Sequence, residues 1–379
     1  MNTSFEFEGQ TLQLHRFPKR ANETFQAWDA GDEYVIKHLE QMPLPSAQHI
    51  LILNDNFGAL SAWFSRNHHV SMMTDSWIAT RACLQNLQRN QCPKINFLTS
   101  LEPIPDNIDL VIMQLPKNNR LLAWQLTQLR AKLPPRCQLI AVNKAKEIHT
   151  STLKLIADYF GEPTTSLAWK KHRLVFAKPT QPNPRIQNDK TTWSVPEHKI
   201  ELTNLANVYS GESLDIGARF MLEHIPSDPS IQSIIDLGCG NGVLSIQAGR
   251  LNPQAQITSV DESFMAVESA RLNLAANIEH YSHEKYQCIA NNCLDGLTDN
   301  SADLVLCNPP FHQGNAITDH IAWQMFCDSK DVLAHRGKLL VVGNRHLRYD
   351  IKLKRLFGDN QVKLIAENNK FTIYEAIRS

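Results

Sequence analysis

Short apolar runs alternate with longer amphipathic stretches along most of the chain, which is the pattern of βαβ units and a parallel sheet. The most apolar runs fall into two groups, one in each half. The first group predicts strands at residues 49–53, 70–74, 109–113 and 138–142, and the second at 233–237, 256–260, 303–307 and 338–342. The pattern therefore predicts an α/β fold with one sheet in each half of the chain.

The two halves also share short sequence patterns in the same order. "NDNFGALS" (54–61) resembles "GCGNGVLS" (238–245), "TDS" (74–76) resembles "VDES" (260–263), and "LPPRCQLIAV" (133–142) resembles "LAHRGKLLVV" (333–342). Strand periodicity is common to all sheets of this class, so part of the agreement is generic. The shared order and the similar spacing nevertheless favour an internal duplication.

The length of 379 residues exceeds the size at which one hydrophobic core stops growing, roughly 250–300 residues, so two domains are expected. Residues 178–196 contain four prolines and few apolar side chains, which is typical of a linker. We expect a first domain at residues 1–180, a linker at 181–196 and a second domain at 197–379.

Composition is that of an ordinary globular protein, with 42% hydrophobic and 20% charged residues. The N-terminus lacks the pattern of a secretion signal, and the sequence contains no apolar run of about 18 residues, so a cytoplasmic protein without a membrane partner is expected. The eight cysteines include no C-x-x-C pair. We interpret them as buried free thiols and expect no bound metal.

The net charge of zero conceals an uneven distribution. Residues 1–196 carry 22 Lys and Arg against 16 Asp and Glu, and residues 197–379 carry 16 against 22. The basic excess is concentrated between positions 117 and 178, at Lys117, Arg120, Arg130, Lys132, Arg136, Lys144, Lys146, Lys154, Lys170, Lys171, Arg173 and Lys178. This cluster makes a partner rich in phosphate plausible.

A glycine-rich turn in the second half has the features of a ligand-binding loop. "IIDLGCGNGVLS" is a predicted strand followed by Gly238, Gly240 and Gly242 and then by a helix. Glycines allow the backbone to approach a ligand closely. The spacing differs from the dinucleotide fingerprint, and Asp236 precedes the turn, so a ligand without a pyrophosphate is favoured.

Asp261 ends the next predicted strand and has two interpretations. A carboxylate at the carboxyl end of such a strand is placed to accept hydrogen bonds from ribose hydroxyls. Alternatively, Asp261 caps the helix that follows, because "DESFMAVESARLNLAAN" has acidic residues in its first turn. Taken alone, this residue does not decide between them.

The tetrapeptide "NPPF", residues 308–311, follows the strand "DLVLC" and favours chemistry at an amine. Pro309 and Pro310 make the segment rigid, and Asn308 supplies an amide oxygen. Such acceptors can hold a planar amino group, while Phe311 offers a ring for stacking. Hydrogen bonds drawn to that amine favour the geometry of the transition state, so neither a general base nor a metal is required. An ordinary proline turn is the alternative for the tetrapeptide alone.

These motifs, in this order, resemble those of class I methyltransferases that use S-adenosyl-L-methionine and modify exocyclic or amide nitrogens. Further segments resemble the ribosomal RNA guanine-N2 methyltransferases, and among them the branch that acts on the 23S rRNA of the large subunit. These are "LQLHRFP" (12–18), "AWDAGDEY" (27–34), "LANVYSGESLDIGARFML" (205–222), "DHIAWQMF" (319–326) and "VGNRHLRYDIKLKRLFG" (342–358). The resemblance spans the whole chain.

The resemblance implies two tandem Rossmann-like domains and a role for each motif. The glycines with Asp236 would frame the methionine part of the cofactor, and Asp261 would hold its ribose. Asn292 would lie near the adenine, although Asn291 and a plain turn compete with that interpretation. Asn308 and the residues after it would hold a flipped guanine. The segment 207–217 would form a lid over the cofactor.

The first half lacks most of this chemistry. Its turn reads "NDNFG" and its tetrapeptide reads "QLPK", so Asn54 and Asn56 replace glycines and Gln114 replaces the asparagine. We expect a degenerate domain that binds no cofactor and serves as a basic platform for RNA phosphates. The residues expected to contact RNA are Lys117, Lys144, Lys146, Lys170, Lys171 and Arg173. Alternatively, the basic residues are scattered over a solvated surface.

Other functions are compatible with parts of the pattern. A tetrapeptide of this kind also binds the reacting amine in enzymes that act on protein glutamine amides, on adenine in DNA and on 16S rRNA of the small subunit. A non-catalytic factor that binds rRNA during assembly is a further alternative, although the intact motifs of the second half argue against it. The sequence indicates neither the guanine that is modified nor whether the substrate is free 23S rRNA or a partly assembled subunit.

Overall fold

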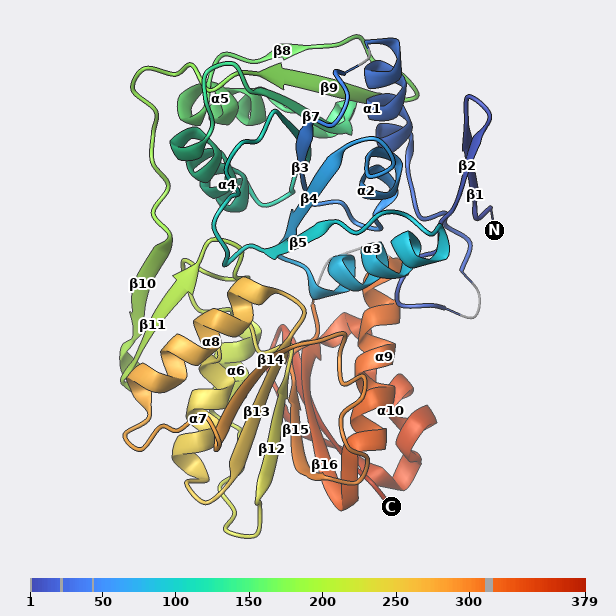
Figure 1. Cartoon of the computed structure of the whole chain (residues 1–379). Helices are drawn as coiled ribbons and strands as arrows, with labels where there is room; N and C mark the ends of the chain where they lie inside the picture. The colour runs from blue at the N-terminus through green and yellow to red at the C-terminus, as the bar shows by residue number, and fades with distance from the viewer. Residues whose placement is uncertain (1, 21–22, 43, 311–315) are drawn as a thin grey trace. The chain divides into compact units, whose positions relative to one another are not determined.

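The computed structural model describes residues 2–20, 23–42, 44–310 and 316–379, and it divides the chain into two units, Met1–Asp189 and Lys190–Ser379 (Figure 1). Within the described residues, each unit contains a seven-stranded sheet and a separate two-stranded hairpin. Helices pack on the sheets in both units (Figure 1). The predicted α/β class is therefore confirmed.

The front unit begins with a hairpin and continues with alternating helices and strands. Its elements are β1 (Ser4–Phe7), β2 (Gln10–Gln13), α1 (Ala30–Gln41), β3 (His49–Leu53), α2 (Ala59–Phe64), β4 (His69–Thr74), α3 (Trp77–Arg89), β5 (Asn96–Thr99), β6 (Leu110–Gln114), α4 (Asn119–Lys132), β7 (Gln138–Lys144), η1 (Ala145–Glu147), α5 (Thr150–Tyr159), β8 (Thr164–Thr165) and β9 (His172–Ala177). The strand order is β5-β4-β3-β6-β7-β9-β8, with β9 antiparallel to β7.

The rear unit repeats this succession. Its elements are β10 (Lys190–Val195), η2 (Pro196–His198), β11 (Ile200–Leu205), α6 (Ile216–Leu222), β12 (Ser233–Leu237), α7 (Val243–Leu251), β13 (Gln256–Asp261), α8 (Phe264–Asn277), β14 (Tyr286–Ala290), β15 (Ala302–Cys307), α9 (Ala316–Val332), β16 (Leu333–Asn344), η3 (Arg345–Leu347), α10 (Tyr349–Phe357), η4 (Asp359–Gln361), β17 (Val362–Glu367) and β18 (Phe371–Ile377). The order β14-β13-β12-β15-β16-β18-β17, with β18 antiparallel to β16, matches that of the front sheet.

All eight predicted strands are present, and they form the central parallel strands of the two sheets. The apolar runs were informative because these strands are covered on both faces. The strands that the pattern did not single out lie toward the sheet edges. For example, β5 and β17 contain only exposed and half-buried residues, and their sequences lack a continuous apolar run.

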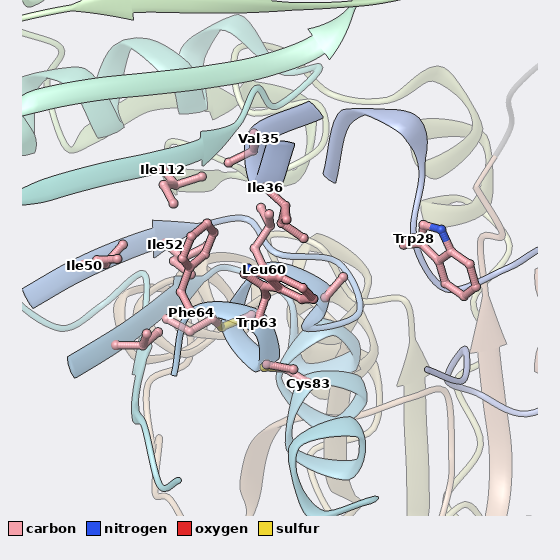
Figure 2. Packing of buried hydrophobic residues seen from close by; sticks show 14 of the residues in the cluster. Trp28, Val35, Ile36, Ile50, Ile52, Leu60, Trp63, Phe64, Cys83 and Ile112 are labelled. Atoms are coloured by element: carbon pink, nitrogen blue, oxygen red, sulfur yellow. The ribbon is translucent and has the colours of Figure 1, made fainter. Parts of the chain in front are cut away.

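Alternate residues of each central strand belong to different cores. In β3, Ile50 and Ile52 pack in one cluster with side chains of α1 and α2, as Figure 2 shows, whereas Leu51 and Leu53 pack in a second cluster with α4 and α5. This separation follows from the two-residue period of a strand. The same division holds in the rear sheet, where residues from β12 alternate between two clusters.

The hairpins show that the repeat includes more than the sheets. In the front unit, Asn86 of α3 and Asn90, the C-cap of that helix, accept hydrogen bonds from backbone N–H groups of residues 15 and 13 at 2.9 and 2.7 Å. In the rear unit, Asn273 and Asn277 of α8 accept equivalent bonds from residues 203 and 201 at 2.7 and 3.0 Å. The same contact in both copies supports the duplication.

The second repeat consequently begins earlier than the sequence indicated. Residues 181–189 form neither helix nor strand, but Lys190–Val195 is the strand β10, which pairs along its length with β11. The prolines that suggested a linker at 181–196 lie on both sides of this strand. A polar hairpin strand resembles a linker in composition because few of its side chains are buried.

The cysteines and the lengths of the helices bear on the chain as a whole. The eight cysteines are free thiols, of which four are buried, as predicted, and four are half-buried. Across the described residues, the helices are either too short or too polar to span a lipid bilayer.

Candidate functional site

The residues singled out in the second half meet at the carboxyl edge of the rear sheet. Gly238 follows β12, Asp261 ends β13, Asn291 follows β14 and Asn308 follows β15. These strands are neighbours in the order β14-β13-β12-β15. The strands that follow β12 in the chain are added on one side of it up to β14, and β15 is added on its other side, so the strand order reverses at β12. In open α/β sheets, the crevice at such a reversal is the place where ligands bind.

The three glycines of the turn have positive φ angles but different surroundings. At Gly240, φ is +52° and an added Cβ would meet no atom within 4 Å, so the missing side chain leaves open space. At Gly238, φ is +76° and a Cβ would lie 3.2 Å from Cε of Met325. At Gly242, φ is +79° and a Cβ would lie 3.0 Å from the backbone of Ala270. Gly242 therefore allows α7 to pack against α8, while Gly240 borders free space.

The front copy retains a glycine only at the position where the rear copy needs one for helix packing. Gly58, the counterpart of Gly242, has φ +83°, and an added Cβ would lie 2.6 Å from Cα of Cys83. The degenerate turn has thus kept the glycine that helix packing requires. The counterparts of Gly238 and Gly240 are Asn54 and Asn56, so the packing of the front unit accommodates a side chain at both positions.

Asp236 lies beneath the turn and is fully buried. Its Oδ2 accepts hydrogen bonds from the backbone N–H and the hydroxyl of Ser245 at 3.0 and 2.6 Å, which ties β12 to α7. Its Oδ1 accepts none from the part of the chain that is described. In the front copy, Asp55 makes the same pair of contacts with Ser61, both at 2.8 Å, although it lies in the turn and not in the strand.

Burial raises the pKa of Asp236 to about 6, which predicts a pH-dependent contribution to stability. Between roughly pH 4 and pH 6 the folded chain retains a proton that the unfolded chain releases, so this contribution falls as the pH rises and is constant above that window. Asp236→Asn should therefore gain on the order of 2–3 kcal/mol of unfolding free energy, relative to the unsubstituted chain, between pH 4 and pH 7.5. Urea denaturation at both pH values measures this difference, and an equal difference at both would contradict it.

Asp261 supports the glycine turn from the neighbouring strand. Its Oδ2 accepts the backbone N–H of Gly240 at 3.0 Å, and its Oδ1 accepts that of Ser263 at 3.0 Å. The residue that caps α8 is Ser263, whose hydroxyl accepts the N–H of Ala266. The alternative that Asp261 caps this helix is therefore wrong.

The front copy has lost this carboxylate. Ser76 caps α3 as Ser263 caps α8, and Ser76 N–H bonds to the side chain of Thr74 as Ser263 N–H bonds to that of Asp261. Thr74 consequently occupies the place of Asp261, and "TDS" aligns with "DES". The similar appearance of "TDS" and "VDES" had concealed the replacement.

The two asparagines after β14 form a tight turn. Asn292 is buried, and its Nδ2 donates to Oδ2 of Asp295 at 2.6 Å, while the backbone of the same two residues closes the turn. Asn291 is also buried, and its Nδ2 donates to the carbonyl of Asp295 at 2.7 Å. Both amides thus stabilise the loop beside Asp261.

Asn308 has one end of its side-chain amide bonded and the other free. Its Nδ2 donates to Oδ2 of Asp215 at 3.1 Å, whereas its Oδ1 is buried and accepts no hydrogen bond from any described residue. A buried acceptor without a donor is costly unless a ligand supplies one. Pro309 is buried and Pro310 is exposed. Phe311 lies outside the described residues.

The corresponding place in the front unit is filled by the side chains of the protein. Asn54 donates to the carbonyl of Gln114 at 3.0 Å, and Asn56 donates to Oε1 of Gln114 at 2.8 Å. The amide nitrogen of Gln114 donates in turn to Asp32 at 2.6 Å, and Asn54 also exchanges hydrogen bonds with Gln125. This network satisfies polar groups at the position where the rear unit leaves the amide oxygen of Asn308 without a donor among the described residues.

The basic residues expected to contact RNA come together at the carboxyl edge of the front sheet. Lys117 follows β6, Lys144 ends β7 and Lys146 lies in η1, whereas Lys170 and Lys171 precede β9 and Arg173 lies in it. Strand β9 is antiparallel to β7, with Lys144 opposite His172 and Asn143 opposite Arg173. The five lysines are exposed and Arg173 is half-buried.

Lys170 and Lys171 form the tip of a hairpin with an unfavourable backbone conformation. Trp169 and His172 exchange backbone hydrogen bonds at 2.8 Å, and the two lysines between them have φ +44° and +66°. Glycine and asparagine are the residues that favour such a turn. Lys170 also pairs with Glu33 at 2.6 Å and lies over the ring of Trp169. Backbone strain of this kind is concentrated at functional sites.

Among the described residues, no group of three or more His, Cys, Asp or Glu side chains is arranged to hold a metal ion. The candidate site thus consists of a backbone turn, one carboxylate and an amide, without a recognisable metal centre.

Comparison with known proteins agrees with this division of the chain. The family description "RLMG N-terminal domain" matches residues 2–181, and "Methyltransferase small domain" matches residues 199–375. A solved structure of a 16S rRNA N2 methyltransferase (RsmC) from T. thermophilus, in complex with AdoMet and guanosine, has a TM-score of 0.78 with 19% identity, covering 100% of this chain and 98% of that one. The fold and its matched domains define a two-domain protein of the methyltransferase class.

Curated relatives identify the family within that class. The ribosomal RNA large subunit methyltransferase G of Vibrio parahaemolyticus is 62% identical, covering 100% of this chain and 98% of its own length. The protein of the same name from Aliivibrio fischeri strain MJ11 is 61% identical, covering 100% and 99%. The chain belongs to the ribosomal RNA large subunit methyltransferase G family. The resemblance inferred from the motifs is confirmed.

Proposed function

We propose that this protein transfers the methyl group of S-adenosyl-L-methionine to the exocyclic N2 of one guanine in 23S rRNA. The observation that carries the proposal is the buried Oδ1 of Asn308, which accepts no hydrogen bond from any described residue and lies at the carboxyl edge of the rear sheet. Full-length relatives at about 60% identity, which carry the name of a large-subunit rRNA methyltransferase, support the choice of substrate.

The residues at this edge fit S-adenosyl-L-methionine. Gly240 offers backbone beside open space, and Asp261 is a half-buried carboxylate at the end of β13, where ribose hydroxyls are bound in folds of this kind. Gly238 and Gly240 would hold the methionine part and Asn292 would lie near the adenine, with Asp236 fixing the turn from below. The bound cofactor supplies the electrophilic methyl group.

Asn308 acts on the other reactant. The amine of guanine is a weak nucleophile because its lone pair is delocalised into the ring. Asn308 Oδ1 accepts a hydrogen bond from one of its N–H groups, which raises electron density on the nitrogen and favours the pyramidal geometry in which the methyl group is received. Pro309 and Pro310 restrict the backbone that carries this side chain.

The front unit supplies RNA binding without chemistry. Its exposed lysines at the carboxyl edge of the sheet suit contacts with phosphates, which position RNA but do not read its sequence. The polar network around Gln114 leaves that unit without a cofactor site of its own. Whether 23S rRNA is bound free or in a partly assembled subunit is an outcome of the assay that follows.

The decisive experiment is the transfer of a labelled methyl group from S-adenosyl-L-methionine to unmodified 23S and 16S rRNA in parallel, followed by digestion to nucleosides. We expect N2-methylguanosine from the 23S rRNA alone. Label in 16S rRNA would move the substrate to the small subunit. The absence of label from both RNAs and from large-subunit assembly particles, with cofactor binding intact, would overturn the proposal.

Replacing Lys170 and Lys171 by Glu should weaken RNA binding and flatten its dependence on salt. Each lost phosphate contact lowers the slope of log affinity against log salt by about one, so a decrease of up to about two is expected. Filter binding of 23S rRNA fragments from low to high salt measures this slope. A slope equal to that of the unsubstituted chain would exclude these lysines from RNA binding.

The same sheet offers a matched control for that pair. Lys94 and Arg136 are also exposed, but they precede β5 and β7 and therefore lie at the opposite edge. The change of both to Glu alters the net charge by the same amount. If the two double variants lose affinity equally, the effect is one of overall charge and the hairpin tip has no special role.

A further inference from the structure

The carboxylate of Asp215 joins the start of α6 to the amide of Asn308. Its Oδ2 accepts a hydrogen bond from the backbone N–H of Ala218 at 2.8 Å and a second from Asn308 Nδ2 at 3.1 Å. Asp215 is the N-cap of α6 and lies in the 207–217 segment, which the resemblance had indicated as a lid. It thus holds one end of the amide whose other end, Oδ1, is left for a ligand.

We propose that Asp215 is a positioning residue, which fixes the Asn308 side chain so that its oxygen and not its NH2 group faces the amine to be methylated. The inference rests on the proposed function. The two ends of an asparagine amide have nearly the same shape but opposite hydrogen-bonding character. Without an anchor, the flipped amide would present donors to a target that is itself a donor.

A carboxylate is suited to this task because it only accepts hydrogen bonds. It binds the NH2 end of Asn308, whereas the flipped amide would bring two oxygen atoms together. The N–H of Ala218 in turn fixes the Asp215 carboxylate, so the start of a helix determines which end of the amide is free. A rigid support of this kind keeps a reacting group in its productive geometry.

The front copy anchors the corresponding amide through a carboxyl group at a different position, with a different outcome. There the amide nitrogen of Gln114 donates at 2.6 Å to Asp32, in the first turn of α1, which corresponds to α6. The amide oxygen, however, accepts the NH2 group of Asn56. Both copies therefore bind the nitrogen end with a carboxyl group at the start of the corresponding helix, although Asp215 is the N-cap of α6 and Asp32 lies three positions after the N-cap of α1. They differ in whether the oxygen is occupied. The free oxygen distinguishes the copy whose glycine turn is intact.

Asp215→Ser separates anchoring from helix capping. Serine is a good N-cap and preserves a hydroxyl for the N–H of Ala218, but its side chain is too short to reach Asn308 as well. We expect kcat with 23S rRNA to fall about 10- to 100-fold, with the dissociation constant for S-adenosyl-L-methionine changed by less than about threefold. Asp215→Asn, whose amide oxygen can replace Oδ2 in both bonds, should recover most of the lost kcat.

Two comparisons distinguish positioning from a structural defect. Asp29→Ser makes the same change at the N-cap of α1 in the front unit and should leave kcat unchanged. Asp215→Ser should also have no further effect when Asn308 is already alanine, because the two residues act through one contact. Full kcat in Asp215→Ser, or an equal loss in the presence and absence of Asn308, would overturn the proposal.

A measurement without turnover keeps the inference separate from the proposed function. The side-chain NH2 signal of Asn308 in a nitrogen-15 spectrum is identified by its loss in Asn308→Ala. It should move in Asp215→Ser and stay in place in Asp29→Ser. An unmoved signal in Asp215→Ser would refute the anchor itself, whereas an inactive unsubstituted protein with a moved signal would refute only the proposed reaction.

Discussion

Asn308→Ala is expected to lower kcat by about 10²- to 10³-fold while the affinity for S-adenosyl-L-methionine stays close to that of the unsubstituted chain. The amide oxygen of Asn308 is buried, and no described residue donates to it, so its removal should change the stability of the folded protein little. The amine of the substrate, however, loses its hydrogen-bond acceptor. Single-turnover transfer to 23S rRNA, with cofactor affinity from calorimetry, measures both quantities. A variant with undiminished turnover would show that the oxygen does not contact the target amine.

Gln114→Ala is the matched control for that prediction, because Gln114 occupies the corresponding place in the front unit. Its amide is bonded to Asn56 and Asp32 and has no free acceptor. The variant should lose stability, since the buried Asp32 loses the hydrogen bond from Gln114, but it should retain turnover when it is assayed below its unfolding temperature. Equal losses of turnover in the two variants would indicate a general structural effect.

Gly240→Val is expected to weaken S-adenosyl-L-methionine binding by about 10- to 100-fold. The open space beside Gly240 would be filled by the new side chain, and overpacking at a contact costs about 1–3 kcal/mol, or roughly one to two powers of ten in affinity. The effect should fall on the cofactor and not on RNA, whose binding we assign to the front unit. Calorimetric titration with the cofactor and filter binding of RNA separate the two.

Gly9→Val controls for the backbone strain of that substitution. Gly9 has φ +77°, and an added Cβ there would also meet no atom within 4 Å, but it lies in the hairpin between β1 and β2 of the front unit. Both variants place a branched side chain in an unfavourable backbone conformation. If the affinity for the cofactor falls equally in both variants, backbone strain is responsible, and not the side chain that fills the space beside Gly240.

The front unit illustrates how a duplicated site is lost while its fold is kept. Gly58 remains because a Cβ would collide with α3, whereas the positions of Gly238 and Gly240 have become asparagines that bond to Gln114. Substitutions at the ligand-facing positions left the packing intact and supplied partners for the exposed polar groups.

The sequence by itself determined the class of the fold, the central strands of both sheets and the order of the motifs. It did so because these features are local: strands covered on both faces require unbroken apolar runs, and a tight turn before a helix requires glycine. The repeated patterns also indicated the duplication. The sequence did not indicate the start of the second repeat at Lys190, because a polar hairpin strand has the composition of a linker.

Only the tertiary structure decided which residues act on which. It paired Asp215 with Asn308, which lie 93 positions apart in the sequence, and it showed that Thr74 replaces the Asp261 carboxylate in the front copy. It also brought Lys144, at the end of β7, to the same edge as the two lysines that precede β9. It assigned Gly242 to packing and Gly240 to open space. The physical reason is that hydrogen bonds and close approaches between distant segments depend on strand order and register, which arise only when the sheets assemble.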